Sequence, residues 1–217
     1  MPLFQVALDL WEREKALTLA QRLLPYVDIL EVGTPLLLSC GLFFVESLRK
    51  VAGKKLIFVD AKIVDAGEEE ARAVFERGGD IVSVLGGASR TTLEGVKRAA
   101  QAFGKRWAVD TIDLLPNALN VPLLEELKPD FLGLHVPHDV VFGDPKAWER
   151  VTFPLSFLRK FPLLVAGGIT PEVLPLLLET FRPEVVVVGS AVTKSPFPEK
   201  VAERVRRILD AFPGKDS

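Results

Sequence analysis

Eight short apolar segments recur along the chain, and each is followed by a longer segment with the periodicity of an amphipathic helix. The apolar segments are nearly continuous rather than alternating, which is typical of β-strands that are buried on both faces. Successive segments start about 22 to 32 residues apart. We therefore predict strands at Phe4–Leu10, Asp28–Val32, Lys55–Asp60, Asp80–Leu85, Arg106–Asp110, Asp130–His135, Pro162–Ala166 and Glu184–Gly189.

Helical periodicity fills the intervals between these strands. Apolar residues spaced by three and four positions recur after the first strand and near the end of the chain, at Ala16, Leu19, Ala20 and Leu23 and at Val201, Val205, Ile208, Leu209 and Phe212. Thr170-Pro171-Glu172 combines a capping threonine with a proline, which predicts the start of the helix after the seventh strand.

Strands that alternate with helices pair in parallel through crossover connections. An open, doubly wound sheet of eight strands is also compatible with this alternation. The units are nearly equal in length and leave no residues for a second domain, which favours a closed barrel. We predict an α/β fold in which residues 1–217 form a single-domain (β/α)8 TIM barrel, with 213–217 as a frayed tail.

Charge and cysteine content exclude several classes of partner. The chain has 27 Lys and Arg against 29 Asp and Glu, and no long basic run, so we expect neither nucleic acid nor a membrane as a partner. No apolar stretch approaches the roughly 18 residues that a membrane span needs, and the amino terminus does not resemble a signal peptide. Cys40 is the only cysteine, which excludes an intrachain disulfide and favours a cytoplasmic location.

Thermolabile side chains are scarce. The chain has two Asn, three Gln, one Cys and one Met against 16 Pro. This balance is typical of proteins from hot environments, and it carries no information about activity.

Acidic side chains stand where three neighbouring strands are predicted to end. Asp9, Glu31 and Asp60 occupy the ends of the first, second and third strands. The active site of such a barrel lies at the carboxyl ends of its strands, where an unpaired buried acid is costly. Each acid alone is compatible with a helix cap or a surface ion pair, whereas the three together predict a cation. Their hard oxygen ligands favour Mg²⁺ or Mn²⁺ over zinc.

The cluster Asp60-x-Lys62-x-x-Asp65 is the sharpest local feature. Two carboxylates flank Lys62 and favour its protonated form, which makes it unsuited to Schiff-base chemistry. A protonated lysine stabilises a developing oxyanion or donates a proton. The competing interpretation is a surface ion-pair network.

A histidine and a fourth acid are predicted at the same edge of the barrel. His135 ends the sixth strand, where a proton-transfer role suits it, although a hydrogen-bonded structural histidine is also compatible with the sequence. Asp110 ends the fifth strand and is expected to contact the substrate. His138 falls in the one long connection and is expected to be solvated.

Glycine-rich turns follow the last two strands. Gly167-Gly168 ends the seventh strand and Gly189-Ser190-Ala191 the eighth, where barrels commonly bind phosphate. Glycine lets backbone N–H groups approach an anion closely at a helix amino terminus. Tight turns alone would also explain these glycines, but their presence in both loops favours a phosphate site.

Several of these segments together resemble a known family. They are Ala7-Leu8-Asp9, Glu31-Val32-Gly33-Thr34-Pro35, Asp60-x-Lys62-x-x-Asp65-Ala66-Gly67, Ser83-Val84-Leu85-Gly86, Val109-Asp110, His135 and Val165-Ala166-Gly167-Gly168-Ile169. Over nearly its whole length the chain resembles 3-hexulose-6-phosphate synthase, a lyase of the orotidine-5′-phosphate decarboxylase suprafamily. The Asp-x-Lys-x-x-Asp element is similar to that of the whole suprafamily, whereas Glu-Val-Gly-Thr-Pro followed by Asp65-Ala66-Gly67 resembles the synthase in particular.

The resemblance implies a reversible, Mg²⁺-dependent aldol reaction. D-Ribulose 5-phosphate and formaldehyde would give D-arabino-hex-3-ulose 6-phosphate through an enediolate. It further implies Glu31 and Asp60 as metal ligands, Lys62 as the residue that stabilises the enediolate, and His135 as the residue for proton transfer.

The resemblance also implies a homodimer with active sites at the interface. Asp9 would contact a substrate hydroxyl, and Asp65 would reach into the site of the partner chain as a catalytic residue. No other cofactor is implied.

Two positions depart from the pattern of the synthases and keep alternatives open. Ser190 stands where family members usually carry arginine, and Val136-Pro137-His138-Asp139-Val140-Val141 replaces their usual loop. One alternative is 3-keto-L-gulonate-6-phosphate decarboxylase, although that family places an arginine at the position of His138. The other is a phosphate-binding barrel with altered or lost catalysis.

Overall fold

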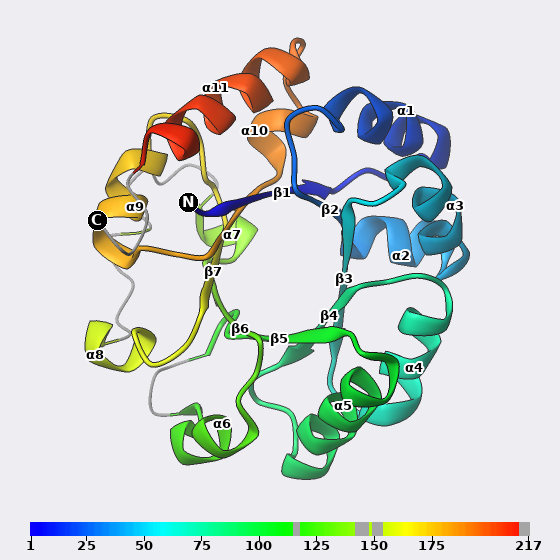
Figure 1. The fold of residues 1–217 in the computed structure, drawn as a ribbon, viewed down its shortest axis with the longest axis vertical. Helices are drawn as coiled ribbons and strands as arrows, with labels where there is room; N and C mark the ends of the chain where they lie inside the picture. Colours follow the sequence, from blue (N-terminus) through cyan, green and yellow to red (C-terminus); the bar gives the residue numbers. More distant parts are fainter. Residues whose placement is uncertain (115–117, 142–147, 149–153, 213–217) are drawn as a thin grey trace.

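The computed structural model describes residues 1–114, 118–141, 148 and 154–212. Eight parallel strands close into a barrel in sequence order, so the predicted fold is confirmed (Figure 1). The strands are β1 (Leu3–Leu8), β2 (Ile29–Val32), β3 (Leu56–Ile63), β4 (Ile81–Leu85), β5 (Arg106–Asp110), β6 (Phe131–His135), β7 (Leu163–Ala166) and β8 (Val185–Val188).

Helices surround the barrel, and some strands are followed by more than one. The helices are α1 (Arg13–Leu23), α2 (Thr34–Cys40), α3 (Phe43–Ala52), α4 (Gly67–Glu76), α5 (Arg90–Phe103), α6 (Val121–Leu127), α7 (His138–Val141), α8 (Leu155–Leu158), α9 (Leu174–Phe181), α10 (Ser190–Thr193) and α11 (Pro198–Ala211). The prediction of one helix per strand is therefore wrong after β2, β6 and β8. Across the described ranges, no helix combines the length and the apolar character that crossing a bilayer requires.

The helix after β7 begins later than predicted. Thr170 caps a short turn, in which its hydroxyl accepts a hydrogen bond from the N–H of Glu172, and α9 starts only at Leu174. Pro175 explains the shift, because proline lacks an N–H and is accommodated only in the first turn of a helix.

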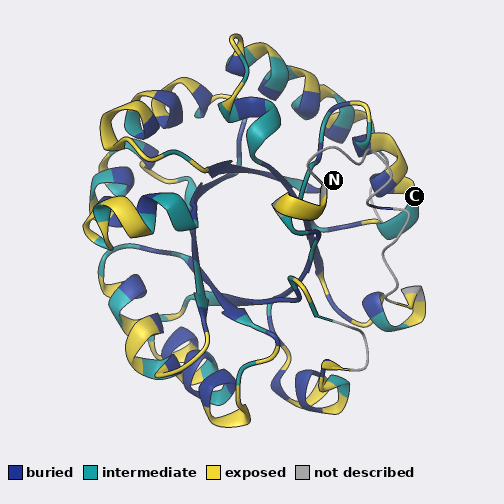
Figure 2. Ribbon diagram, turned by 180° about the vertical axis from the view of Figure 1, so that it is seen from behind, coloured by how far each residue is buried: buried dark blue, intermediate teal, exposed yellow. Residues whose placement is uncertain are grey.

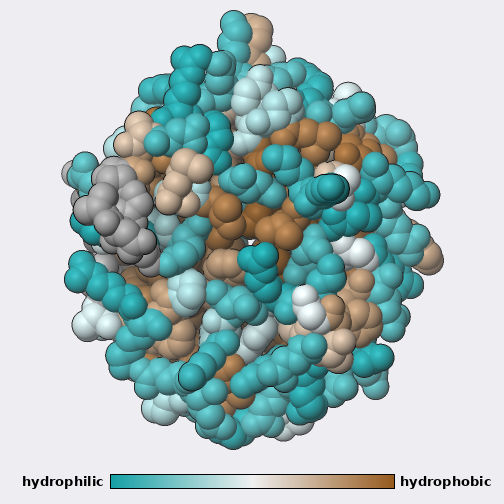
Figure 3. Space-filling view, viewed as in Figure 1, coloured by the Kyte–Doolittle hydropathy of each residue, from teal (hydrophilic) through white to brown (hydrophobic). Residues whose placement is uncertain are grey.

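Two apolar layers hold the barrel together. One fills its interior with alternate strand residues, and the larger one lies between the strands and the helices. Figure 2 shows the strands as a buried ring inside helices whose outer sides are exposed, and Figure 3 shows hydrophobic side chains gathered over the middle of the barrel. Strands with both faces in contact with apolar side chains explain the continuous apolar runs of the sequence.

Acids placed before the even-numbered strands cap the odd-numbered ones. Each accepts a hydrogen bond from a backbone N–H near the start of the preceding strand, in the pairs Asp28–Phe4, Asp80–Ile57, Asp130–Trp107 and Glu184–Leu163. This fourfold repeat satisfies donors at the amino end of the barrel, the end where such folds place stabilising rather than catalytic residues.

β3 extends beyond its predicted end at Asp60. Its pairing with β4 shifts register between Val59 and Ile63, which makes an irregularity of the bulge type. Asp60 and Lys62 lie inside this irregular segment, at the carboxyl end of the barrel.

Candidate active site

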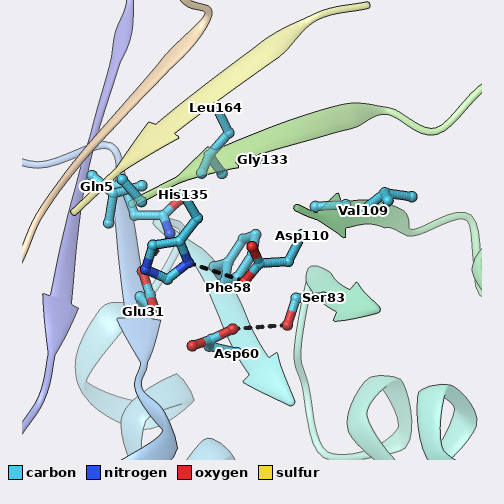
Figure 4. A pocket seen from close by; sticks show the side chains of 13 residues that line it. Gln5, Glu31, Phe58, Asp60, Ser83, Val109, Asp110, Gly133, His135 and Leu164 are labelled. Atoms are coloured by element: carbon cyan, nitrogen blue, oxygen red, sulfur yellow. Dashed lines mark hydrogen bonds and ion pairs between the residues drawn. The ribbon is translucent and has the colours of Figure 1, made fainter. Parts of the chain in front are cut away.

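A pocket at the carboxyl ends of the strands collects polar side chains from β1 to β6 (Figure 4). Its polar lining is formed by Gln5, Glu31, Asp60, Ser83, Asp110 and His135. Apolar residues of β3, β5, β7 and β8 form the rest of the wall. The structure therefore brings together both predicted metal ligands, Asp110 and the predicted proton-transfer histidine.

Glu31 is a buried carboxyl group of the pocket whose charged form is disfavoured by its surroundings. It is 7% exposed and accepts a hydrogen bond from Gln5 Nε2 at 2.6 Å. Burial raises the pKa of Glu31 well above its ordinary value, and the negative charges of Asp60 and Asp9 raise it further against the opposing effects of Gln5 and Lys62. A cation beside Glu31 would relieve this repulsion.

Lys62 forms ion pairs with acids of two strands. Its ammonium contacts Asp60 Oδ2 and lies 3.4 Å from Asp110 Oδ2. Burial alone would lower the pKa of Lys62, but the carboxylates of Asp60, Asp110 and Glu31 outweigh burial and raise it above the ordinary value. Lys62 is therefore an ammonium ion at neutral pH, as the sequence predicts.

Asp65 is not the second partner of Lys62, so that part of the prediction is wrong. Asp65 is exposed, and its Oδ1 accepts a hydrogen bond from the N–H of Ala66 at 2.8 Å. The side chain stays beside the backbone ahead of α4 and does not line the pocket of its own chain.

His135 and Asp110 form a hydrogen-bonded pair. His135 Nδ1 lies 3.1 Å from Asp110 Oδ2, and Asp110 Oδ1 accepts from the N–H of Ile112 at 2.8 Å. Burial would raise the pKa of Asp110, but the hydrogen bond and charge of His135, the charge of Lys62 and the Ile112 N–H together lower it. An ionised Asp110 only accepts hydrogen bonds, so Nδ1 of His135 donates and Nε2 of the neutral ring is left as the basic nitrogen.

Asp9 lies just beyond the end of β1, against two glycines. A methyl group at Gly33 would come within 2.1 Å of Asp9 Oδ1, and one at Gly189 within 3.1 Å of Oδ2. The exposed carboxylate of Asp9 therefore lies between the ends of β2 and β8. On one side of it is the strand that carries Glu31, and on the other is the predicted phosphate loop.

The donors suit a metal ion that takes few protein ligands. In the part of the chain that the structure describes, no three His, Cys, Asp or Glu side chains are grouped closely enough to enclose a metal. The cation expected from Asp9, Glu31 and Asp60 therefore stays a prediction, without a ready-made site of three side chains. Glu31 and Asp60 remain, and Mg²⁺ is commonly bound by one or two carboxylates together with water and substrate oxygens.

Gly167 and Gly168 have φ angles of +107° and +59°, which glycine adopts readily. A Cβ on Gly167 would lie 2.1 Å from the carbonyl oxygen of Val136, and Trp148 Nε1 donates to Gly167 O at 2.9 Å. A tight turn thus accounts for these two glycines by itself. Because α9 starts at Leu174, this loop is not at a helix amino terminus, contrary to the prediction.

The loop after β8 matches the prediction more closely. Gly189 precedes α10 directly, and Ser190 and Ala191 form its first turn. The backbone N–H groups of that turn are oriented along the helix axis at the mouth of the barrel. The side chain of His138 and residues 142–147 and 213–217 lie outside the described residues, so the predictions for that loop and for the tail are not tested.

Gln5 and Ser83 are pocket residues to which the sequence analysis assigns no role. Both are 1% exposed, and each is a polar residue within an otherwise apolar strand. That interruption of the apolar run is a signal visible in the sequence, because a buried polar side chain needs a partner.

A family model described as the orotidine 5′-phosphate decarboxylase / HUMPS family matches residues 2–126, more than half of the chain. The chain belongs to this family. It is 35% identical to the 3-hexulose-6-phosphate synthase of Mycobacterium gastri over 212 residues, which cover 94% of this chain and 98% of the relative. The resemblance to the synthases, and with it an enzyme of the lyase class, is confirmed.

Solved structures give the same result for the fold. The crystal structure of 3-hexulose-6-phosphate synthase from Salmonella typhimurium matches with a TM-score of 0.90 at 32% identity, and covers 97% of this chain and 100% of that one. A 3-keto-L-gulonate-6-phosphate decarboxylase from Vibrio cholerae matches at 23% identity and a TM-score of 0.79, with 98% and 99% of the two chains covered. At that identity the second likeness concerns the fold alone.

Proposed function

We propose that this family member catalyses the aldol condensation of D-ribulose 5-phosphate with formaldehyde to D-arabino-hex-3-ulose 6-phosphate, in a reversible, Mg²⁺-dependent reaction. The observation that carries the proposal is the continuous chain of contacts Asp60–Lys62–Asp110–His135 across three strands. An ammonium ion in contact with two carboxylates of the pocket, and an imidazole that lines it, supply the two groups that enediolate chemistry requires, which supports the proposal.

Proton transfer is assigned to His135. Its Nε2 takes the proton from C1 of ribulose 5-phosphate, the electron pair of that C–H bond forms the C1–C2 double bond of the enediolate, and the π pair of the C2 carbonyl moves onto its oxygen. The enediolate oxygen lies near Lys62, whose ammonium balances its charge. The electron pair of the C1–C2 double bond then forms the bond to the carbon of formaldehyde, and the C2 carbonyl re-forms. The π pair of formaldehyde moves onto its oxygen, to which His135 returns the proton.

Glu31 and Asp60 would hold the metal ion. When bound, Mg²⁺ acts as a Lewis acid that stabilises negative charge on substrate oxygens. Gln5 orients Glu31 for this role through its 2.6 Å hydrogen bond. Asp9 would bind a substrate hydroxyl, and its place between Gly33 and Gly189 suits a contact midway between metal and phosphate.

The phosphate is assigned to the loops after β7 and β8. Gly189, Ser190 and Ala191 offer backbone N–H groups at the start of α10, and Gly167 and Gly168 offer a turn on the neighbouring strand. Ser190 in place of arginine leaves these amides as the principal ligands.

We further propose a homodimer in which Asp65 completes the partner's active site. Asp65 is exposed and lies outside the pocket of its own chain, as a residue used in trans would. Trp11, Leu38 and Val64 follow β1, β2 and β3 and are 65%, 73% and 59% exposed. Apolar side chains exposed in the segments that follow three neighbouring strands, one of them directly before Asp65, support burial of this edge against a second copy.

The reaction is tested by incubating purified protein with ribulose 5-phosphate and formaldehyde, with and without Mg²⁺, and following the loss of formaldehyde. We expect loss that stops on addition of EDTA and returns with excess Mg²⁺ or Mn²⁺. No metal-dependent loss would reject the synthase. Release of CO₂ from 3-keto-L-gulonate 6-phosphate in its place would support the decarboxylase alternative, and inactivity toward both substrates would support a barrel with lost catalysis.

The dimer is tested by mixing two inactive variants, Lys62→Ala and Asp65→Asn. In a mixed dimer one of the two sites receives both native residues, so equal mixing should restore about a quarter of the native turnover. No recovery, with mixed dimers present by mass spectrometry, would show that Asp65 does not act in trans.

A further inference from the structure

Ser83 on β4 is a buried hydroxyl that the proposed mechanism leaves without a role. Its side chain is 1% exposed and lines the pocket beside Asp60 and Asp110. Its strand neighbours Val82 and Val84 are fully buried aliphatic residues. A polar group at such a position costs free energy unless it is hydrogen-bonded, so its partners show what it does.

The hydroxyl joins both ends of the Asp60–Lys62 segment. Ser83 Oγ accepts a hydrogen bond from the backbone N–H of Lys62 at 2.9 Å and donates one to Asp60 Oδ1 at 2.9 Å, the second of which is drawn in Figure 4. A hydroxyl has one hydrogen, and an amide N–H only donates, so the directions of both bonds are fixed. One atom of β4 thus fixes the backbone of Lys62 and the side chain of Asp60.

The irregularity of β3 explains why such a contact is needed. Regular pairing with β4 is interrupted between Val59 and Ile63, and Lys62 has a φ of +47°, a left-handed conformation that is costly for a residue with a Cβ. Strained backbone of this kind persists only where surrounding contacts hold it in place. Ser83 Oγ supplies such a contact to the N–H of Lys62 itself.

The same contact decides which oxygen of Asp60 meets which partner. Oδ1 accepts from Ser83, and Oδ2 contacts the ammonium of Lys62. We propose that Ser83 is a positioning residue, whose hydroxyl orients the Asp60 carboxylate toward the metal ion and the Lys62 ammonium toward the substrate. The inference rests on the proposed functions of Asp60 and Lys62.

The first test is Ser83→Ala, which removes the hydroxyl and little volume. We expect kcat to fall about 10- to 100-fold, the range typical of lost contacts to metal ligands, with a smaller change in KM for ribulose 5-phosphate. The Kd of Mn²⁺, measured by calorimetry on metal-free protein without substrate, should rise about tenfold. Native kcat together with native Mn²⁺ affinity would overturn the proposal.

Ser83→Thr and Ser83→Val form a matched pair, because both add volume and only threonine keeps the hydroxyl. We expect the Thr variant to retain most of the turnover and Mn²⁺ affinity, and the Val variant to lose as much as Ser83→Ala. Equal losses in the pair would assign the effect to packing and overturn the role of the hydroxyl.

Thr92→Val is the control for general loss of a buried hydroxyl. Thr92 is 5% exposed in α5, contacts Ser89 Oγ at 2.9 Å and lies outside the pocket. The Tm of Thr92→Val should fall while its kcat and Mn²⁺ affinity stay native. If this variant loses kcat and Mn²⁺ affinity as Ser83→Ala does, the assignment to Ser83 is overturned. If the native protein is inactive but the Ser83 variants bind Mn²⁺ more weakly, the proposed reaction is rejected and the positioning role stands. If the native protein is active and the Ser83 variants match it in kcat and Mn²⁺ affinity, only the positioning role is rejected.

Discussion

His135 Nδ1 lies 3.1 Å from Asp110 Oδ2, and this one contact sets the chemistry of the imidazole. The same oxygen is 3.4 Å from the ammonium of Lys62, so Asp110 contacts both the lysine and the histidine of the candidate site. Because Asp110 stays ionised, the proton of the neutral ring resides on Nδ1 and the exchangeable site is Nε2. The pair therefore orients the ring so that Nε2 is the free nitrogen, as the proposed role of His135 in proton transfer requires.

Asp110→Asn should leave the barrel folded and inactivate it. An asparagine can present its N–H₂ group to Nδ1, which moves the ring proton to Nε2 and removes the basic site. We expect kcat to fall roughly 100-fold or more, the contribution typical of a positioned acid–base group, with little change in KM. Steady-state kinetics with both substrates and a thermal unfolding curve measure the two effects.

His135→Asn and the double variant complete this experiment. If Asp110 acts through His135, the double variant should be no slower than His135→Asn alone, because the two residues work as a unit. Losses that multiply in the double variant would show that Asp110 has an independent catalytic role.

Substitutions of Lys62 test both its role in turnover and the strain of its left-handed backbone. Lys62→Ala and Lys62→Gly should both abolish turnover, because the ammonium opposite the enediolate is lost. Since φ is +47° at this position, glycine should be more stable than alanine by roughly 1 kcal/mol. Denaturant unfolding of the two variants measures the difference; an alanine variant as stable as the glycine variant, or native turnover in either, contradicts the assignment.

Strand positions could be predicted from the sequence because parallel strands buried on both faces are continuous apolar runs. β5 occupies the predicted bounds, Arg106–Asp110, and His135 ends β6 as expected. In a barrel with strands in sequence order, topology alone puts the acids and the histidine at one edge. This much of the candidate site needs no side-chain geometry.

The partner of Lys62 could not be predicted, because it depends on a local irregularity. Asp65 is close in sequence, but the bulge in β3 and the left-handed backbone of Lys62 place its ammonium near Asp110, 48 positions along the chain. Nothing in the composition of the segment reveals a bulge. A proline explains the error at the start of α9, since Pro175 rather than Pro171 lies in its first turn.

Gly33→Ala should impair the enzyme through Asp9. The new Cβ would lie 2.1 Å from Asp9 Oδ1, the mobile end of an exposed side chain, so the carboxylate would move while the barrel stays intact. Displacement of a substrate contact by about 1 Å can cost about 100-fold, and we expect kcat/KM for ribulose 5-phosphate to fall by roughly 10- to 100-fold. Kinetics at saturating formaldehyde measure it.

Gly87→Ala is the matched control, because its Cβ would meet only Leu114 at an ordinary 3.5 Å. It should be native in turnover and Tm. The double variant Gly33→Ala with Asp9→Ala should be no worse than Asp9→Ala; a further loss would mean that Gly33 acts by another route.

Asp80 allows a test of the four acids that cap the odd-numbered strands at the amino end of the barrel. Its Oδ2 accepts from the N–H of Ile57 at 2.9 Å and contacts Arg49, and its Oδ1 accepts from Lys105 Nζ at 2.6 Å. Burial would raise the pKa of Asp80, but the hydrogen bonds from Lys105 and Ile57 and the charges of Arg49 and Lys105 lower it below the ordinary value.

A carboxyl whose pKa is lowered on folding stabilises the native state above its unfolded pKa, and that stabilisation is lost as pH falls through the folded value. Asp80→Asn should therefore cost about 2 kcal/mol at pH 7, typical of a charged hydrogen bond, and lower Tm by roughly 4–8 °C. The difference in the free energy of unfolding between Asp80→Asn and the native protein should shrink as pH drops below 3.8, the ordinary pKa of aspartate.

Glu203→Gln is the control, because it removes an exposed ion pair with Arg207 and should change Tm little at any pH. Unfolding curves of the three proteins from pH 7 down to the acid transition measure this, and an Asp80→Asn deficit that stays constant across the range would show that the Asp80 charge contributes nothing.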